Sequence, residues 1–112
     1  MNDLGTYYGA TLLDEIDLLE TSDQNRIELE YYGTEKHSNN KSKEQTFYGI
    51  SIVKKEYKQD KIKYEKNTID KISTNENIVE NIIAIMKQHK VTPIGLEDVL
   101  RDLLKKPEFQ ET

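Results

Sequence analysis

The chain of 112 residues contains no cysteine and no tryptophan, and it has only two prolines and two histidines. The absence of cysteine excludes a disulfide framework and any thiolate nucleophile or metal ligand. The longest apolar run, residues 82–86, is five residues long, whereas a membrane-spanning helix needs ~20. The N-terminus does not follow the basic, then apolar pattern of a signal peptide. We therefore expect a cytoplasmic protein that makes no membrane contact.

Residue patterns that carry catalytic or metal chemistry are equally scarce. His37 and His89 have no second histidine or glutamate at the spacing of a metal-binding pair. The five glycines do not follow the spacing of a phosphate-binding loop. The nearby acids Asp14, Glu15 and Asp17 are more typical of a solvated surface than of a catalytic pair. We expect no catalytic residue, no metal site and no cofactor.

Arginine is also rare, and the basic residues are concentrated in one part of the chain. The net charge of −5 divides into −7 over residues 1–34, +4 over residues 35–73 and −2 over residues 74–112. Lysines with interleaved tyrosines could track phosphates and stack on bases. Lysine is also the usual protection of a solvent-facing strand. The acidic balance and the interrupting acids favour the second interpretation.

Alternating apolar residues predict strands over residues 26–33 and 46–57, followed by a fourth strand that begins near residue 61. The strand over 46–57 is apolar on both faces and is the best candidate for a central strand. Gly49 within it indicates a bulge or a close backbone contact. Residues 10–20 fit either a strand or a helix, and we favour a strand. Residues 34–45 contain no large apolar side chain and are expected to form a mobile loop.

Two amphipathic helices are predicted in the C-terminal third. Residues 73–76 match a capping box that starts a helix over 75–89. Thr92 and Pro93 then suit the N-cap and first position of a second helix over 92–106, and Pro107 ends it. Six apolar residues on these helices are expected to be buried in the core: Ile82, Ile83, Leu96, Val99, Leu100 and Leu103.

Together these elements predict one α+β domain over residues 1–112, with its core over about 10–106 and a tail over 107–112. The chain length is that of a single domain. Its architecture is an antiparallel β-meander of about four strands with a C-terminal pair of antiparallel helices packed on one face.

Two sets of residues could contact a partner. A protein-binding surface would draw on spare tyrosines, an outward apolar residue and the outer face of the second helix: Tyr32, Tyr48, Ile85, Glu97, Asp98 and Arg101. Ile85 could instead pack beneath the N-terminal segment. A nucleic-acid surface would use the hairpin over 54–71: Lys54, Lys55, Tyr57, Lys58, Lys61, Lys63 and Tyr64.

Several segments, taken in order, are similar to those of a small uncharacterised family. They are Glu30-Tyr31-Tyr32, residues 47–55, Ile72-Ser73-Thr74 and residues 91–100. The chain resembles, over roughly residues 26–104, short proteins of anaerobic, often spore-forming Gram-positive bacteria that are classed as a domain of unknown function. The resemblance implies a bacterial cytoplasmic setting and a regulatory role around stationary phase or sporulation. It implies no catalytic residue.

We therefore expect a small, non-enzymatic regulatory or adaptor protein that binds an unidentified protein or a second copy of itself. The alternative is a nucleic-acid-binding regulator that uses the lysine- and tyrosine-rich hairpin. A small-molecule sensor or enzyme would require a cavity of several hundred Å³ lined by convergent polar groups.

Overall fold

The computed structural model describes residues 5–12, 26–40, 43–58 and 60–110. Four strands come first: β1 (Thr6–Leu12), β2 (Arg26–Asn40), β3 (Lys43–Lys58) and β4 (Lys61–Ser73). Two helices follow, α1 (Glu76–Gln88) and α2 (Leu96–Leu104), and a short 3₁₀ turn, η2 (Pro107–Phe109), comes last.

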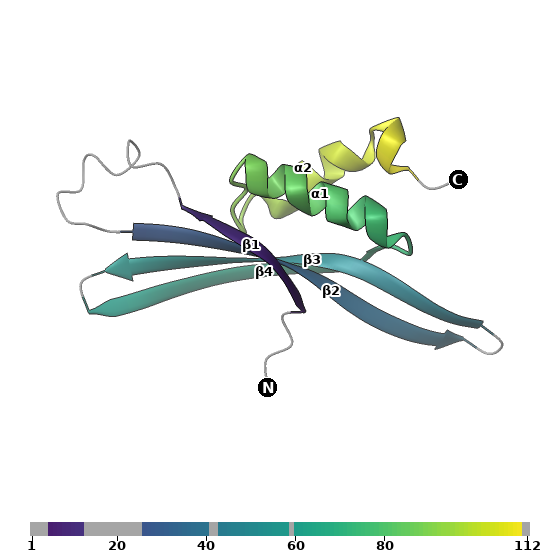
Figure 1. The fold of residues 1–112 in the computed structure, drawn as a ribbon, viewed down its shortest axis with the longest axis horizontal. Coiled ribbons are helices and arrows are strands. Elements are labelled where there is room, and N and C mark those ends of the chain that lie inside the picture. The colour runs from purple at the N-terminus through teal and green to yellow at the C-terminus, as the bar shows by residue number, and fades with distance from the viewer. Residues whose placement is uncertain (1–4, 13–25, 41–42, 59, 111–112) are drawn as a thin grey trace.

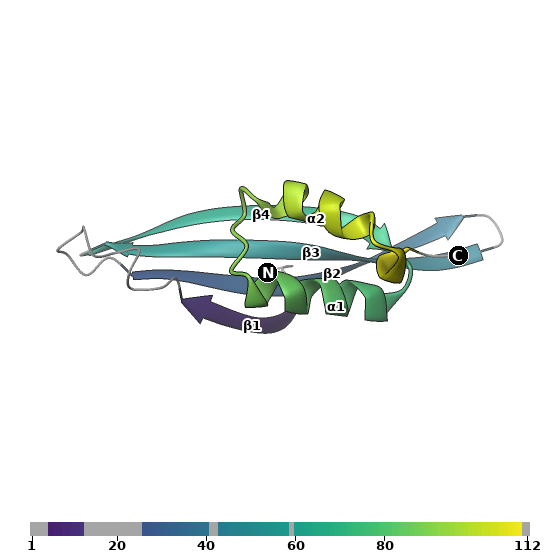
Figure 2. The same ribbon diagram turned by 90° about the horizontal axis from the view of Figure 1, so that it is seen from above.

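The strands form one antiparallel sheet in the order β1-β2-β3-β4, which is a meander. Both helices lie on the same side of this sheet (Figure 1). Seen from above, α1 lies over β1 and β2, whereas α2 lies over β4 and runs in the opposite direction (Figure 2). The predicted α+β meander with a helix pair on one face is confirmed, and β3 is the central strand expected from its apolar composition.

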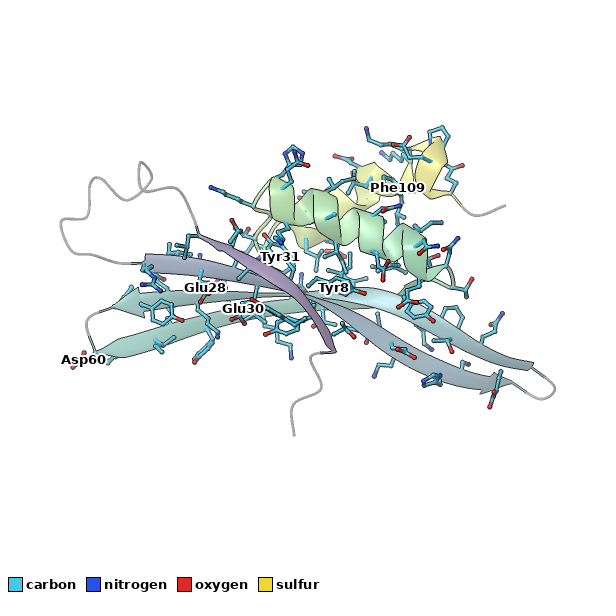
Figure 3. All side chains as sticks on the ribbon, in the orientation of Figure 1. Tyr8, Glu28, Glu30, Tyr31, Asp60 and Phe109 are labelled. Carbon is cyan, nitrogen blue, oxygen red and sulfur yellow. The ribbon has the colours of Figure 1, made fainter. Side chains whose placement is uncertain are left out.

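The core lies between the sheet and the helices. Leu29 and Tyr31 of β2 and Ile50 and Ile52 of β3 are fully buried there, because side chains two residues apart share a face of a strand. The labelled Tyr31 side chain points toward the helices, whereas those of Glu28 and Glu30 lie on the opposite side of the sheet (Figure 3).

Five of the six core residues predicted on the helices are buried, and the sixth, Val99, is partly buried against the core. The core also extends beyond its predicted limit. Phe109 lies in η2, within the segment predicted to be a tail, and only 6% of its surface is exposed. The tail prediction is therefore wrong for this residue, since an aromatic ring after Pro107 can fold back onto the helices.

The prediction of a loop over residues 34–45 is wrong in its described part. Residues 34–40 belong to β2 and residues 43–45 to β3, and the two strands pair in register as far as Asn40 and Lys43. The pairing continues past the helices as a projecting two-stranded ribbon (Figure 1). A radius of gyration of 16.0 Å, against the about 13 Å typical of a chain of this length, reflects this elongation.

The strand predicted over residues 10–20 is present as far as Leu12, and residues 13–25 lie outside the described part of the chain. The register between β3 and β4 shifts between Tyr48 and Ile50, which confirms the irregularity predicted at Gly49. A side chain at Gly49 would collide with the carbonyl oxygen of Ile69. The close backbone contact therefore requires glycine at this position.

The residues predicted to cap the two helices are wrong, although the first helix was predicted to start at residue 75, within one residue of the start of α1. Asn75, not Ser73, is the N-cap of α1, and its side-chain oxygen accepts hydrogen bonds from the backbone N–H groups of Asn77 and Ile78. Helix α2 begins at Leu96 after a turn, and its N-cap is Gly95 rather than Thr92. Asparagine caps a helix as well as serine does. In the second helix, the residues after Thr92 form a turn, closed by a hydrogen bond from the Gly95 N–H to the Thr92 carbonyl, instead of the first helical turn.

Candidate functional site: the open face of the sheet

The side of the sheet away from the helices is the candidate site, and we call it the open face. Within the described ranges, no helix or strand packs on it (Figures 1 and 2). The strand register assigns its residues from all four strands: Tyr7, Ala10, Leu12, Arg26, Glu28, Glu30, Tyr32, Thr34, Ser51, Val53, Lys55, Tyr57, Ile62, Tyr64, Lys66 and Thr68.

Large apolar side chains remain exposed on the open face. Five large hydrophobic residues of the described chain are exposed, and four of them lie there: Tyr7 at 55%, Leu12 at 49%, Ile62 at 45% and Tyr64 at 60%. The fifth, Ile94, lies in the connection between the helices and is 81% exposed. Scattered exposed apolar residues are ordinary, but a cluster on one face is typical of an interaction surface.

Glu30 lies at the centre of a hydrogen-bond network on the open face. One carboxylate oxygen accepts a 2.8 Å hydrogen bond from the Tyr32 hydroxyl, and the other accepts a 2.9 Å bond from the Lys55 ammonium. The Glu30 side chain is only 13% exposed. Burial, reinforced by the bond and the negative charge of Glu30, raises the pKa of Tyr32 to about 12. The hydrogen bond to Glu30 also raises the pKa of Lys55.

A second polar group lies further along the same strands. The Tyr57 hydroxyl donates a 3.1 Å hydrogen bond to Glu28, and this bond is the main cause of the raised pKa of Tyr57. The Arg26 guanidinium lies 5.4 Å from the centre of the Tyr57 ring, within the range of a cation–π contact. Tyr7 and Tyr32 also meet, with ring centres 5.4 Å apart. The polar groups of the open face are thus largely paired with one another.

A shallow groove of about 610 Å³ adjoins this network and is lined mainly by polar residues from all four strands. Its volume reaches the several hundred Å³ that a small-molecule site requires. Three of its four side-chain hydroxyls are engaged with other side chains, however. Thr34 donates to Asp70 at 2.9 Å, and the hydroxyls of Ser51 and Thr68 lie 2.8 Å apart. Because these groups bind one another, the groove does not favour a small-molecule ligand.

The predicted protein-binding residues do not share one surface. Tyr32 is on the open face, whereas Tyr48 and Ile85 pack against the core on the helix side. Of the two alternatives given for Ile85, the structure supports a packed side chain rather than an outward one. The other three residues are exposed on α2, where Arg101 and Asp98 form a 3.2 Å ion pair: Glu97, Asp98 and Arg101.

The predicted nucleic-acid residues are also divided. The register places Lys55, Tyr57 and Tyr64 on the open face and the remaining lysines on the other side of the sheet: Lys54, Lys58, Lys61 and Lys63. Carboxylates neutralise three of the lysines, in the pairs Lys54–Glu65 at 3.6 Å, Lys55–Glu30 at 2.9 Å and Lys58–Glu56 at 3.7 Å. A surface that tracks phosphates needs several unpaired cations on one side, and of these five lysines only Lys61 and Lys63 have no ion pair among the described residues.

Residues 13–106 match a family described as "Family of unknown function (DUF6514)". The chain belongs to this family. Neither a curated protein nor a solved structure matches this chain. No helix in the described ranges has the length and apolar character to cross a membrane. Among those same residues, no three acidic, histidine or cysteine side chains gather in a way that could hold a metal ion.

Sequence reasoning missed Tyr7, Leu12 and Ile62 as candidate contact residues. Tyr7 and Leu12 belong to β1, whose register slips between Tyr7 and Gly9, so alternation along the strand does not reveal their shared face. Ile62 does alternate with lysines, and this pattern is equally typical of a core-facing residue. One signal could have identified them: the strands contain more large apolar residues than the helix-covered face of the sheet can bury.

Proposed function

We propose that this protein is a non-enzymatic adaptor or regulator that binds another protein through the open face of its sheet. One observation carries the proposal: four large apolar residues are exposed to solvent on this one face, namely Tyr7, Leu12, Ile62 and Tyr64. Tyrosine is enriched in protein interfaces because its ring buries apolar area while its hydroxyl keeps a hydrogen bond.

The internal pairing of the charged groups supports the same proposal. An isolated carboxylate or ammonium group is costly to cover with protein, whereas a paired and hydrogen-bonded group costs much less. Glu28, Glu30 and Lys55 already have partners. A partner surface could therefore cover the open face without leaving these charges unpaired.

The setting of the protein is a further part of the proposal. The resemblance to short proteins of anaerobic, spore-forming Gram-positive bacteria supports a bacterial cytoplasmic location and a regulatory role around stationary phase or sporulation. The excess of lysine over arginine is consistent with an AT-rich genome. Nucleic-acid binding is the weaker alternative, because three of the predicted lysines are held by carboxylates.

Site-specific photo-cross-linking in the host cell tests this function. A photoreactive amino acid replaces Tyr64 on the open face or, as a matched control, Ile94 in the helix connection. The exposed fraction of Ile94 is even larger than that of Tyr64. We expect a defined covalent protein adduct from position 64 and none from position 94. Equal labelling at both positions, or no protein adduct at position 64, would contradict a protein-binding open face.

A further inference from the structure

The open face carries a self-complementary row of side chains. The register places Leu12 opposite Glu28, Glu28 opposite Lys55 and Lys55 opposite Tyr64. The row therefore reads apolar, acidic, basic, apolar across the four strands. The two outer residues of the row, Leu12 and Tyr64, are both apolar, and the two inner residues, Glu28 and Lys55, have opposite charges. A copy of the row turned end to end therefore places apolar residues on apolar residues and the acid on the base.

This order determines how two copies can meet face to face. A two-fold axis that runs along the strands, between β2 and β3, places β1 over β4 and β2 over β3 of the second copy. Leu12 then faces Tyr64 of the second copy, and Glu28 faces its Lys55. A two-fold axis across the strands would instead place β2 over β2 and bring the acids Glu28 and Glu30 together, which like-charge repulsion disfavours.

The neighbouring row is compatible with the first arrangement. It contains Ala10, Glu30, Val53 and Lys66 in strand order, so Glu30 would face Val53 of the second copy. Glu30 keeps its bonds to Tyr32 and Lys55 in this contact. Ala10 would face Lys66, whose long side chain can carry its ammonium group to the solvent at the edge of the interface. Val53 is apolar but only 5% exposed, so it adds a small contact at the centre of the face.

Sheet geometry and size also fit. Sheets that pack face to face commonly keep their strands within about 30° of each other, which an axis along the strands provides. Four strands spaced about 4.8 Å apart and seven residues of about 3.3 Å each make a face of roughly 450 Å² per copy. The total of roughly 900 Å² is below the roughly 1,200–2,000 Å² of a stable specific interface, so the association is expected to be weak and reversible.

We propose that the partner of the open face is a second copy of this chain, bound as a face-to-face dimer in which Leu12 of each copy contacts Tyr64 of the other. This proposal rests on the proposed protein-binding function and names the partner. A different protein bound to the same face would leave the proposed function in place and remove the dimer.

Two variants at exposed positions, Leu12→Glu and Tyr64→Lys, test the pairing by sedimentation equilibrium over a wide concentration range. The symmetry repeats each substitution at two contacts, so each variant alone should dimerise about tenfold or more weakly than the wild type. An equimolar mixture should recover dimers. In the mixed pair, the introduced glutamate faces the introduced lysine at one contact, and the other contact is the native one between Leu12 and Tyr64. Thermal melting of each variant verifies that the fold is intact.

Ile94→Lys is the matched control, since it adds the same charge outside the open face. It should dimerise like the wild type and should not rescue Leu12→Glu in a mixture. A wild-type monomer at all concentrations would overturn the dimer, as would variants that dimerise normally. Loss of association in both variants without recovery in the mixture would overturn this pairing. A cross-link from position 64 to a different protein, combined with a monomer in solution, would separate failure of the dimer from failure of the proposed function.

Discussion

The Tyr31 hydroxyl donates a 2.8 Å hydrogen bond to the backbone carbonyl of Val91, 60 residues further along the chain. Tyr31 is fully buried in β2, and Val91 lies in the connection between α1 and α2. A second sheet residue acts in the same place, since the Asn67 side chain donates a 3.0 Å bond to the carbonyl of Pro93. These two bonds attach the helix connection to the sheet and fix the helix layer to one side of it, which leaves the other side open.

Replacing Tyr31 with phenylalanine should lower the free energy of unfolding by about 1–3 kcal/mol, because the buried Val91 carbonyl loses its donor. Urea denaturation measures this change. Tyr64→Phe, which removes a hydroxyl at an exposed position on the open face, is the control and should leave the free energy of unfolding almost unchanged. Equal effects of the two substitutions would show that the Tyr31 bond does not stabilise the helix layer.

Phe109→Ala should destabilise the protein by about 3–5 kcal/mol, the usual cost of removing a buried aromatic ring. The ring is 6% exposed and belongs to the core cluster. Glu108→Ala changes the exposed preceding residue of η2 and should have little effect. A melting curve of Phe109→Ala that coincides with the wild type would mean that the end of the chain is a tail after all.

The helix α1 and the central position of β3 could be predicted from sequence because each has a strong local signal. Val79, Ile82, Ile83 and Met86 recur at helical spacing, and they are the buried residues of α1. The ends of the helices were less predictable. Both Ser73 and Asn75 can cap a helix, and only the direction in which the chain leaves β4 decides between them.

The distal part of the β2–β3 hairpin could not be predicted, because residues 34–45 lack the apolar alternation that indicates a strand. The pairing of residues 34–40 with residues 43–49 comes from backbone hydrogen bonds that continue the register set by Tyr31 and Ile52. The open face was only partly predictable for a related reason. Its members come from four strands, and a register shift of one residue would move them to the other side.

Stability should fall at alkaline pH, above about pH 10. The pKa values of Tyr8 and Tyr32 are raised to about 12, mainly by burial and then by Glu80 and Glu30 respectively. The folded protein therefore retains protons that the unfolded chain releases near pH 10. The stabilisation is fully present below pH 10 and is lost as the pH rises toward 12. Urea denaturation at a series of pH values measures this loss.

Glu30→Gln isolates the contribution of one tyrosine. Without the negative charge of Glu30, the pKa of Tyr32 should move down toward its ordinary value, and tyrosinate absorbance should show ionisation at lower pH than in the wild type. Glu80→Gln should act in the same way on Tyr8, on the other side of the sheet. An unchanged titration in both variants would rule out the two carboxylates as causes of the raised pKa values.

Nucleic-acid binding should be absent even at low salt. Lys54, Lys55 and Lys58 are paired with carboxylates, and the hairpin divides its lysines between the two sides of the sheet. Gel retardation with mixed DNA and RNA fragments tests this expectation. A complex that forms at low salt and dissociates steeply as salt increases would favour the alternative function.

Hydroxyl-radical footprinting tests the central claim most directly, because it reports which side chains another molecule covers. Oxidation rates are compared between dilute purified protein and the same protein inside its host cells. We predict protection in cells at the four exposed apolar residues of the open face, Tyr7, Leu12, Ile62 and Tyr64, and an unchanged relative rate at Ile94. Equal rates in both conditions at all five residues would contradict the claim that the open face is a protein-binding surface.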